Sequence, residues 1–171
     1  MTVIGDSVLT AVTLNEKPLE TMTEGLDVDM EVVVCRRLVD VSCPFEGVRT
    51  PTLRDLVAAF GPRLGRVVVV VGGYNEPEAE FADALEQSLS ALRGAGVMRV
   101  VWASFSQRRG DFARMNVTLA AAVRWHPELT IVDWAAASRD HADSFQPDGA
   151  ISPTAVRSRW RASCEAPSTG R

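Results

Sequence analysis

Short runs of β-branched and apolar residues alternate along this chain with longer segments in which apolar residues recur every three or four positions. This alternation is typical of a parallel sheet covered by helices. We therefore expect an α/β fold, a three-layer α/β/α sandwich around a five-stranded parallel sheet. The expected strands are residues 2–4, 31–34, 66–71, 98–105 and 129–134, and the expected helices are residues 7 to about 18, 50–60, 77–93, 111–125 and 153–163.

The third expected strand contains five consecutive valines, from Val67 to Val71, which predicts a central strand buried on both faces. Trp102 and Trp134 are placed on later strands and are expected in the core rather than as platforms for a sugar. The chain shows neither a repeat nor a linker. Residues 1–164 are therefore expected to form a single domain, and residues 165–171 a disordered tail.

The composition excludes several classes of partner. The 171 residues carry a net charge of −4, which indicates neither nucleic acid nor an anionic membrane. No apolar run approaches the about 20 residues of a membrane helix, and no signal peptide is visible. We expect no membrane span and a cytoplasmic location, unless the chain is cut from a secreted or membrane-anchored precursor. The oligomeric state is left open.

The cysteines give no metal motif. No Cys–His cluster has zinc-ligand spacing, and the chain has neither a Gly-x-Gly-x-x-Gly nor a Walker loop, so no metal or cofactor is expected. Cys35 and Cys43 are eight residues apart around an expected loop and could form a disulfide, which would leave Cys164 unpaired. Free thiols are the preferred expectation for a chain without a visible signal peptide.

Four polar stretches follow expected strands, at the edge of a parallel sheet where ligands bind. They are Gly5-Asp6-Ser7, the loop with Gly47, Gly73-Tyr74-Asn75-Glu76, and Asp148-Gly149. Their order and separations resemble the sequence blocks of the SGNH (GDSL-type) hydrolase family over nearly the whole chain. The resemblance implies the SGNH hydrolase fold with flavodoxin-like strand order. It also implies a serine ester hydrolase that works through an acyl-serine intermediate.

The resemblance assigns roles to individual residues. Ser7 matches the nucleophile, and a strand-to-helix turn is a favourable place for developing negative charge. Asp6 is expected to hydrogen-bond within this turn. The N–H groups of Ser7 and Gly47 and the side chain of Asn75 match the oxyanion hole, in which each donor is typically worth ~3 kcal/mol. Glu76 departs from the family's usual Gly-x-Asn-Asp.

The last block lacks the histidine that should act as the base. The family pattern is Asp-x-x-His, whereas this chain reads Asp148-Gly149-Ala150-Ile151-Ser152-Pro153. Asp148 keeps the carboxylate of the block. Alignment on Asp148 places Ile151 at the histidine position, and alignment on the following residues places Ala150 there. His141 is a possible substitute base, although a surface role is favoured. His126 is expected to be structural, because it lies at a helix end that points away from the site.

Three explanations of the missing histidine stay open, because a serine hydroxyl without a base is a poor nucleophile at neutral pH. The chain is a naturally inactive member that keeps a binding pocket, or it carries an active-site substitution at Ala150, or His141 or Asp148 serves as a weaker base. The predicted function is that of an SGNH-type serine ester hydrolase, impaired as written. Its expected substrate is a small acyl ester or an acylated carbohydrate. The alternative is a catalytically inactive binding module that retains the pocket.

Two arginine pairs also follow expected strands on the ligand side of the sheet. Arg36-Arg37 comes after the second strand, and Arg108-Arg109 comes after the fourth. Arginine forks could clamp an acidic substrate, but solvated loop arginines are the favoured interpretation.

Overall fold

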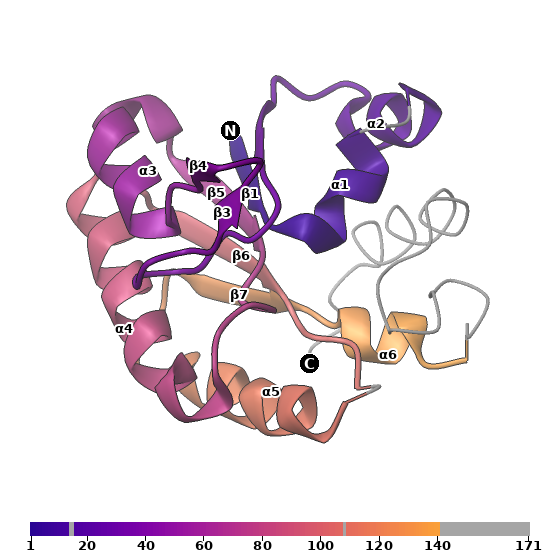
Figure 1. Cartoon of the computed structure of the whole chain (residues 1–171), viewed down its shortest axis with the longest axis vertical. Coiled ribbons are helices and arrows are strands. Elements are labelled where there is room, and N and C mark those ends of the chain that lie inside the picture. The colour runs from indigo at the N-terminus through magenta and orange to yellow at the C-terminus, as the bar shows by residue number, and fades with distance from the viewer. Residues whose placement is uncertain (14–15, 108, 141–171) are drawn as a thin grey trace.

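The sheet has the expected strand number and direction. The structure, a computed structural model, describes residues 1–13, 16–107 and 109–140 of the chain. Five parallel strands form one sheet in the order β2-β1-β5-β6-β7, with helices on both faces (Figure 1). This confirms the α/β class, the three-layer sandwich and the flavodoxin-like strand order. The strands are β1 (Thr2–Gly5), β2 (Asp29–Val32), β5 (Val67–Val71), β6 (Arg99–Ala103) and β7 (Leu129–Val132).

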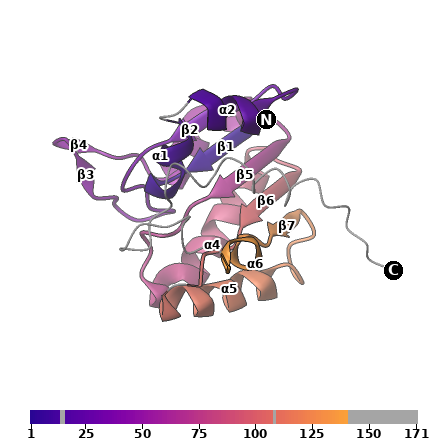
Figure 2. The ribbon, with the colours of Figure 1, turned by 90° about the vertical axis from the view of Figure 1, so that its right-hand side faces the viewer.

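Two apolar clusters join the sheet to its helices. The larger cluster packs three helices onto one face, and the smaller cluster packs two short helices onto the other. Figure 2 shows the strands between α1 and α2 on one side and α4 and α5 on the other. The large face carries α3 (Leu53–Phe60), α4 (Glu78–Gly94) and α5 (Gly110–Ala122); the other face carries α1 (Ser7–Thr13) and α6 (Trp134–Ser138), with α2 (Glu16–Thr23) beside α1 and the 3-10 turn η1 (Gly61–Leu64) after α3.

The sequence explains these elements locally. The valines of β5 alternate between the two clusters, with Val68 and Val70 in the larger and Val71 in the smaller, which confirms burial on both faces. Trp102 and Trp134 are 0% and 4% exposed and belong to the core, as predicted. The start of α3 is fixed by a capping box, in which the Thr52 hydroxyl accepts the Asp55 N–H and the Asp55 carboxylate accepts the Thr52 N–H, both at 3.0 Å.

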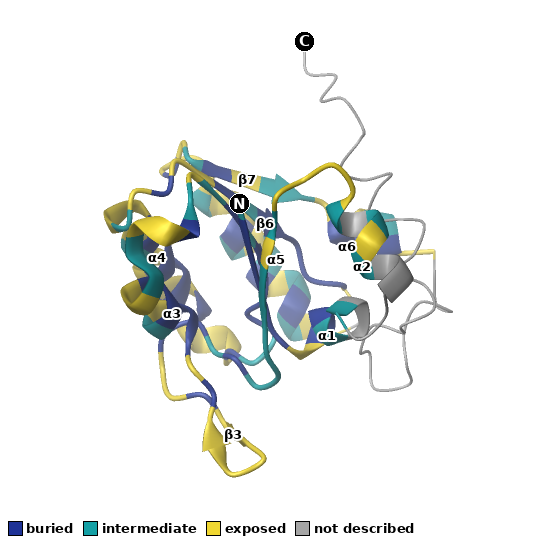
Figure 3. Cartoon of the chain, turned by 90° about the horizontal axis from the view of Figure 1, so that it is seen from above, coloured by how far each residue is buried: buried dark blue, intermediate teal, exposed yellow. Residues whose placement is uncertain are grey.

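One element has no counterpart in the prediction. Between β2 and α3, the strands β3 (Pro44–Phe45) and β4 (Val48–Arg49) form a small antiparallel hairpin, which projects from the body as an exposed loop (Figure 3). Its turn residues Glu46 and Gly47 have φ values of 51° and 78°. Positive φ at both turn positions is typical of a tight hairpin turn. Strands of two residues are too short to leave a hydrophobic pattern, so the sequence could not reveal them.

Several boundaries also differ. The second strand lies at 29–32 rather than 31–34, and the predicted strand 129–134 ends at Val132. There the Asp133 carboxylate accepts the Ala136 N–H at 2.9 Å and starts α6. The first predicted helix is two helices, and Pro18 lies in the first turn of the second rather than at the break.

The end of the chain lies beyond the part that the structure describes. The expected helix 153–163 and tail 165–171 lie outside the described residues, so the boundary of a single domain at residue 164 stays a prediction. Among the described helices, none is long and apolar enough to cross a membrane. Within the same part of the chain, no group of three or more His, Cys, Asp or Glu side chains is suited to a metal ion.

Candidate functional site

Ser7 lies where the strand order of the sheet reverses. From β1, the chain continues through β2 on one side, whereas β5, β6 and β7 lie on the other. Loops leave the carboxyl ends of β1 and β5 in opposite directions, and such a switch point is where open α/β sheets bind ligands. Ser7 is the first residue of α1 and its side chain is exposed. Ser7 therefore lies exposed at the switch-point edge of the sheet.

The buried carboxylate of Asp6 links the Ser7 turn to the loop after β5. One oxygen accepts the Val8 N–H at 3.0 Å and the other accepts the Tyr74 N–H at 3.1 Å, so Asp6 hydrogen-bonds in the turn as predicted. Burial raises the pKa of Asp6 to about 6, although the hydrogen bonds from Val8, Tyr74 and Gly73 and the charge of Arg36 act in the opposite direction. The turn at Ser7 and the third block are thus held together by one side chain.

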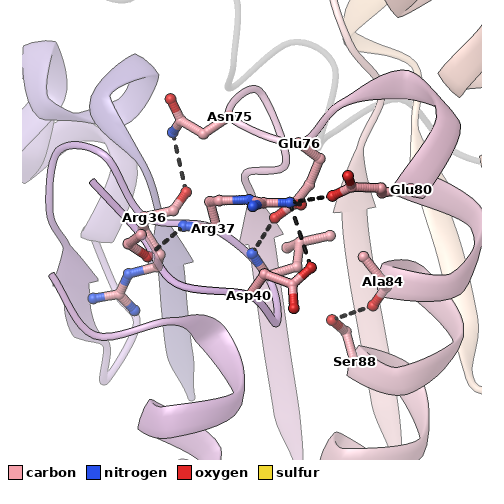
Figure 4. Close-up of polar contacts among 10 residues, drawn as sticks. Arg36, Arg37, Asp40, Asn75, Glu76, Glu80, Ala84 and Ser88 are labelled. Atoms are coloured by element: carbon pink, nitrogen blue, oxygen red, sulfur yellow. Dashed lines mark hydrogen bonds and ion pairs between the residues drawn. The ribbon is translucent and has the colours of Figure 1, made fainter.

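The third block takes a conformation that requires glycine. Gly73 has φ of 105°, and a Cβ atom there would meet the Phe105 ring at 3.0 Å. Asn75 is half-buried, and its side-chain Nδ2 donates to the carbonyl oxygen of Arg36 at 3.0 Å (Figure 4). Asn75 therefore reaches the loop after β2, so the loops after β1, β2 and β5 are connected through Asp6 and Asn75.

Gly47, the other predicted oxyanion donor, occupies the exposed turn of the β3–β4 hairpin, and a Cβ atom at this position would have nothing within 4 Å. The positive φ of the turn accounts for a glycine here. No hydrogen bond joins Gly47 to Ser7 or Asn75 among the described residues, so its predicted role in an oxyanion hole gains no contact from the structure. The part of the second loop that contacts Asn75 and Glu76 is instead Arg36 to Leu38.

A disulfide closes this part of the loop. Cys35 and Cys43 are bonded to each other, so the expectation of free thiols is wrong for this pair. Cys35 has φ of 64°, an uncommon conformation for a residue with a side chain. The sequence showed the spacing of the two cysteines but could not show whether they pair, because pairing depends on how the loop folds back.

Arg36 and Arg37 are not solvated loop arginines, which corrects the favoured interpretation. Arg36 is 5% exposed, and its Nε and Nη1 atoms find no hydrogen-bond partner among the described residues. Burial lowers the pKa of its guanidinium, while the charges of Glu31 and Asp6 act to raise it. Arg37 donates through Nε and Nη2 to one oxygen of Glu76, at 3.0 and 2.7 Å. Nothing in the sequence alone distinguished these two side chains from exposed cations.

The described histidine is not placed to assist Ser7. The His126 ring is buried, with Nε2 at 2.7 Å from a Glu86 oxygen and Nδ1 at 3.4 Å from a Glu128 oxygen. Its carbonyl accepts the N–H of Leu129, the first residue of β7, so His126 lies at the amino end of that strand. A parallel sheet places this end opposite Ser7, in agreement with the structural role predicted. The possible substitute base His141 and the last-block residues Asp148 and Ala150 lie outside the described residues.

Comparison with known proteins shows the fold. No family model matches the chain, and no curated protein matches it significantly. The chain is similar to the N-terminal part of a Bacteroides fragilis protein that contains a phosphatase domain, complexed with Mg, with a TM-score of 0.53, 11% identity, and coverage of 91% of this chain and 48% of that one. It is also similar to a Clostridium thermocellum family 3 carbohydrate esterase, with a TM-score of 0.53, 15% identity, and coverage of 92% and 90%. This chain thus spans about half of the first chain, at 48%, and most of the second, at 90%. At these identities, both likenesses show the α/β fold alone.

Proposed function

We propose that this chain is a serine ester hydrolase of the SGNH type, with Ser7 as the nucleophile, and that it is impaired as written because no histidine occupies the last block. One observation carries the proposal. The exposed Ser7 begins a helix at the switch point of the sheet, and Asp6 ties that turn to the loop that bears Asn75.

The chemistry would be acyl transfer through the serine. The Ser7 oxygen attacks the ester carbonyl, the C–O bond of the leaving alcohol breaks, and water later hydrolyses the acyl-serine. The Ser7 N–H and the Asn75 side-chain amide are the donors we assign to the oxyanion. One Nδ2 hydrogen of Asn75 is donated to the Arg36 carbonyl, and the other has no acceptor among the described residues. The attacking hydroxyl must lose its proton. Without an imidazole in the last block, that step is slow.

The proposed substrate is a small acyl ester carried by a carbohydrate. Similarity to a carbohydrate esterase over 92% of this chain supports this class, and the exposed Ser7 suits a short acyl group on a large molecule. The Cys35–Cys43 disulfide supports work in an oxidising compartment rather than the cytoplasm.

The decisive experiment restores the base. Ala150→His is prepared alone and with one inserted residue, which restores the Asp-x-x-His spacing of the last block, and each protein is assayed with p-nitrophenyl acetate and with an acetylated sugar. We expect hydrolysis to rise by about 100-fold or more, which is the range of one general base, and Ser7→Ala to abolish the gain. Long-chain p-nitrophenyl esters should be poorer substrates than the acetate. A better rate with long chains would contradict the proposed small acyl group.

The alternative function is an inactive binding module. The observation that favours it is the well-fixed loop structure around Ser7 in a chain whose described histidine lies at the other end of the sheet. If neither restored variant hydrolyses an ester while the unaltered chain binds an acetylated sugar in calorimetry, the binding module is the correct reading. His141→Ala tests whether His141 serves as a weaker base, because activity that survives this change does not depend on His141.

A further inference from the structure

We infer that Glu76 is a positioning residue: its carboxylate holds the loop after β2, and with it the main chain of Arg36, against Asn75. Glu76 follows Asn75 directly, and its side chain is 0% exposed. One carboxylate oxygen accepts the Nε and Nη2 hydrogens of Arg37, and the other accepts the backbone N–H of Leu38 (Figure 4). A single buried side chain thus contacts both the side chain and the main chain of the loop.

The loop in turn fixes the side chain of Asn75. Along the chain, Arg36 lies between Cys35, which the disulfide holds, and Arg37 and Leu38, which Glu76 holds. The carbonyl oxygen of Arg36 accepts a hydrogen bond from Nδ2 of Asn75 at 3.0 Å. The Arg37 N–H also donates to the Ser42 hydroxyl at 2.9 Å, which joins the two ends of the loop. Because the Asn75 amide is planar, the hydrogen bond to Arg36 sets the direction of its second Nδ2 hydrogen. Glu76 therefore acts on the proposed oxyanion donor through Arg36.

The strength of these contacts makes the arrangement rigid. Hydrogen bonds between charged groups are about twice as strong as neutral ones, and the pair is buried on the Glu76 side. The partial burial of Arg37 lowers the pKa of its guanidinium, but the hydrogen bonds to Glu76 and Glu80 outweigh it and raise the pKa above its ordinary value. The glutamate at the position where the resembled family has aspartate thus contacts the loop through both of its carboxylate oxygens.

Glu76→Gln tests this inference, with Glu80→Gln as the matched control. Glu80 is 52% exposed and accepts the Nη2 hydrogen of the same arginine at 2.6 Å, but among the described residues it accepts no backbone N–H of the loop. Amide hydrogen exchange needs no catalysis, so it comes first. We expect exchange at residues 35–38 to be about tenfold faster in Glu76→Gln, the difference between a charged and a neutral acceptor, and unchanged in Glu80→Gln. If Glu76→Gln does not fold, Arg37→Lys replaces it, since lysine keeps the charge but not the fork.

The catalytic part rests on the proposed function and is measured in the Ala150→His background. We expect kcat to fall by about tenfold or more in Glu76→Gln with KM within about threefold, because an oxyanion donor acts in the transition state. Unchanged amide exchange overturns the inference, and so does faster exchange with an unchanged kcat. If exchange is faster but Ala150→His hydrolyses nothing, the proposed function fails and the catalytic part of the inference fails with it, whereas the hold of Glu76 on the loop is supported.

Discussion

The buried carboxylate of Asp6 predicts how stability should vary with pH. Its pKa in the folded protein is about 6, against an ordinary value of 3.8, with burial as the main cause. The folded state therefore binds the proton more tightly than the unfolded state. This contribution to stability is fully present below pH 3.8 and is lost as the pH rises through 6. Ionised Asp6 is tolerated in the core because Val8 and Tyr74 donate to it.

The size of the effect follows from the two pKa values. The difference between 3.8 and about 6 corresponds to about 3 kcal/mol at about 1.4 kcal/mol per pKa unit. Roughly 2 kcal/mol of this change falls between about pH 4.5 and pH 7.5, since the unfolded state is already mostly ionised at the lower limit. In the Asp6→Asn variant the side chain cannot ionise, so its free energy of unfolding lacks this pH-dependent contribution.

The assay compares the two proteins rather than either alone. Urea unfolding is followed by tryptophan fluorescence at four pH values between about 4.5 and 7.5, since Trp102 and Trp134 are buried. Other carboxylates whose pKa the fold lowers, such as Asp55 and Glu128, are present in both proteins and cancel in the difference. We expect the wild type to lose about 2 kcal/mol relative to Asp6→Asn as the pH rises. A difference that stays constant, or that changes in the opposite direction, refutes the reasoning.

Three further changes test the packing around the site. Gly73→Ala should destabilise the chain by about 2 kcal/mol or more, because φ is 105° and the new Cβ would meet the Phe105 ring at 3.0 Å. The control Gly94→Ala, in open space at the end of α4, should be neutral or stabilising by up to about 1 kcal/mol. Thermal melts that show Gly94→Ala to be the less stable of the two variants would contradict this prediction. Thr52→Ala should cost about 1 kcal/mol by removing the capping box of α3, and a loss below the error of a urea titration would show that the cap is not needed. Replacing Cys35 and Cys43 together with serine should cost about 2–3 kcal/mol in the same titration, because the disulfide closes a short loop; equal stability with and without reductant in the wild type would argue against the bond.

The resemblance located the candidate site only in part. Asp6-Ser7 and Gly73-Tyr74-Asn75 follow β1 and β5 as expected, because the carboxyl ends of parallel strands meet at one edge of the sheet whatever the loops do. Gly47 shows the limit of this reasoning. Its sequence position in the loop after β2 was right, but a hairpin carries it to an exposed turn. Where a residue lies within a long loop depends on contacts that no periodic pattern records.

The sequence by itself determined the layers, the five strands and the turn that presents Ser7, since burial of alternating and helical apolar positions leaves few other arrangements. It also determined that the last block has no histidine. Only the tertiary structure decided which loop meets Asn75, that Cys35 and Cys43 pair, and that Arg37 and Glu76 form a buried ion pair. The physical reason is that these contacts join residues up to 39 positions apart, and a charged side chain in sequence looks the same whether its partner is water or a buried carboxylate.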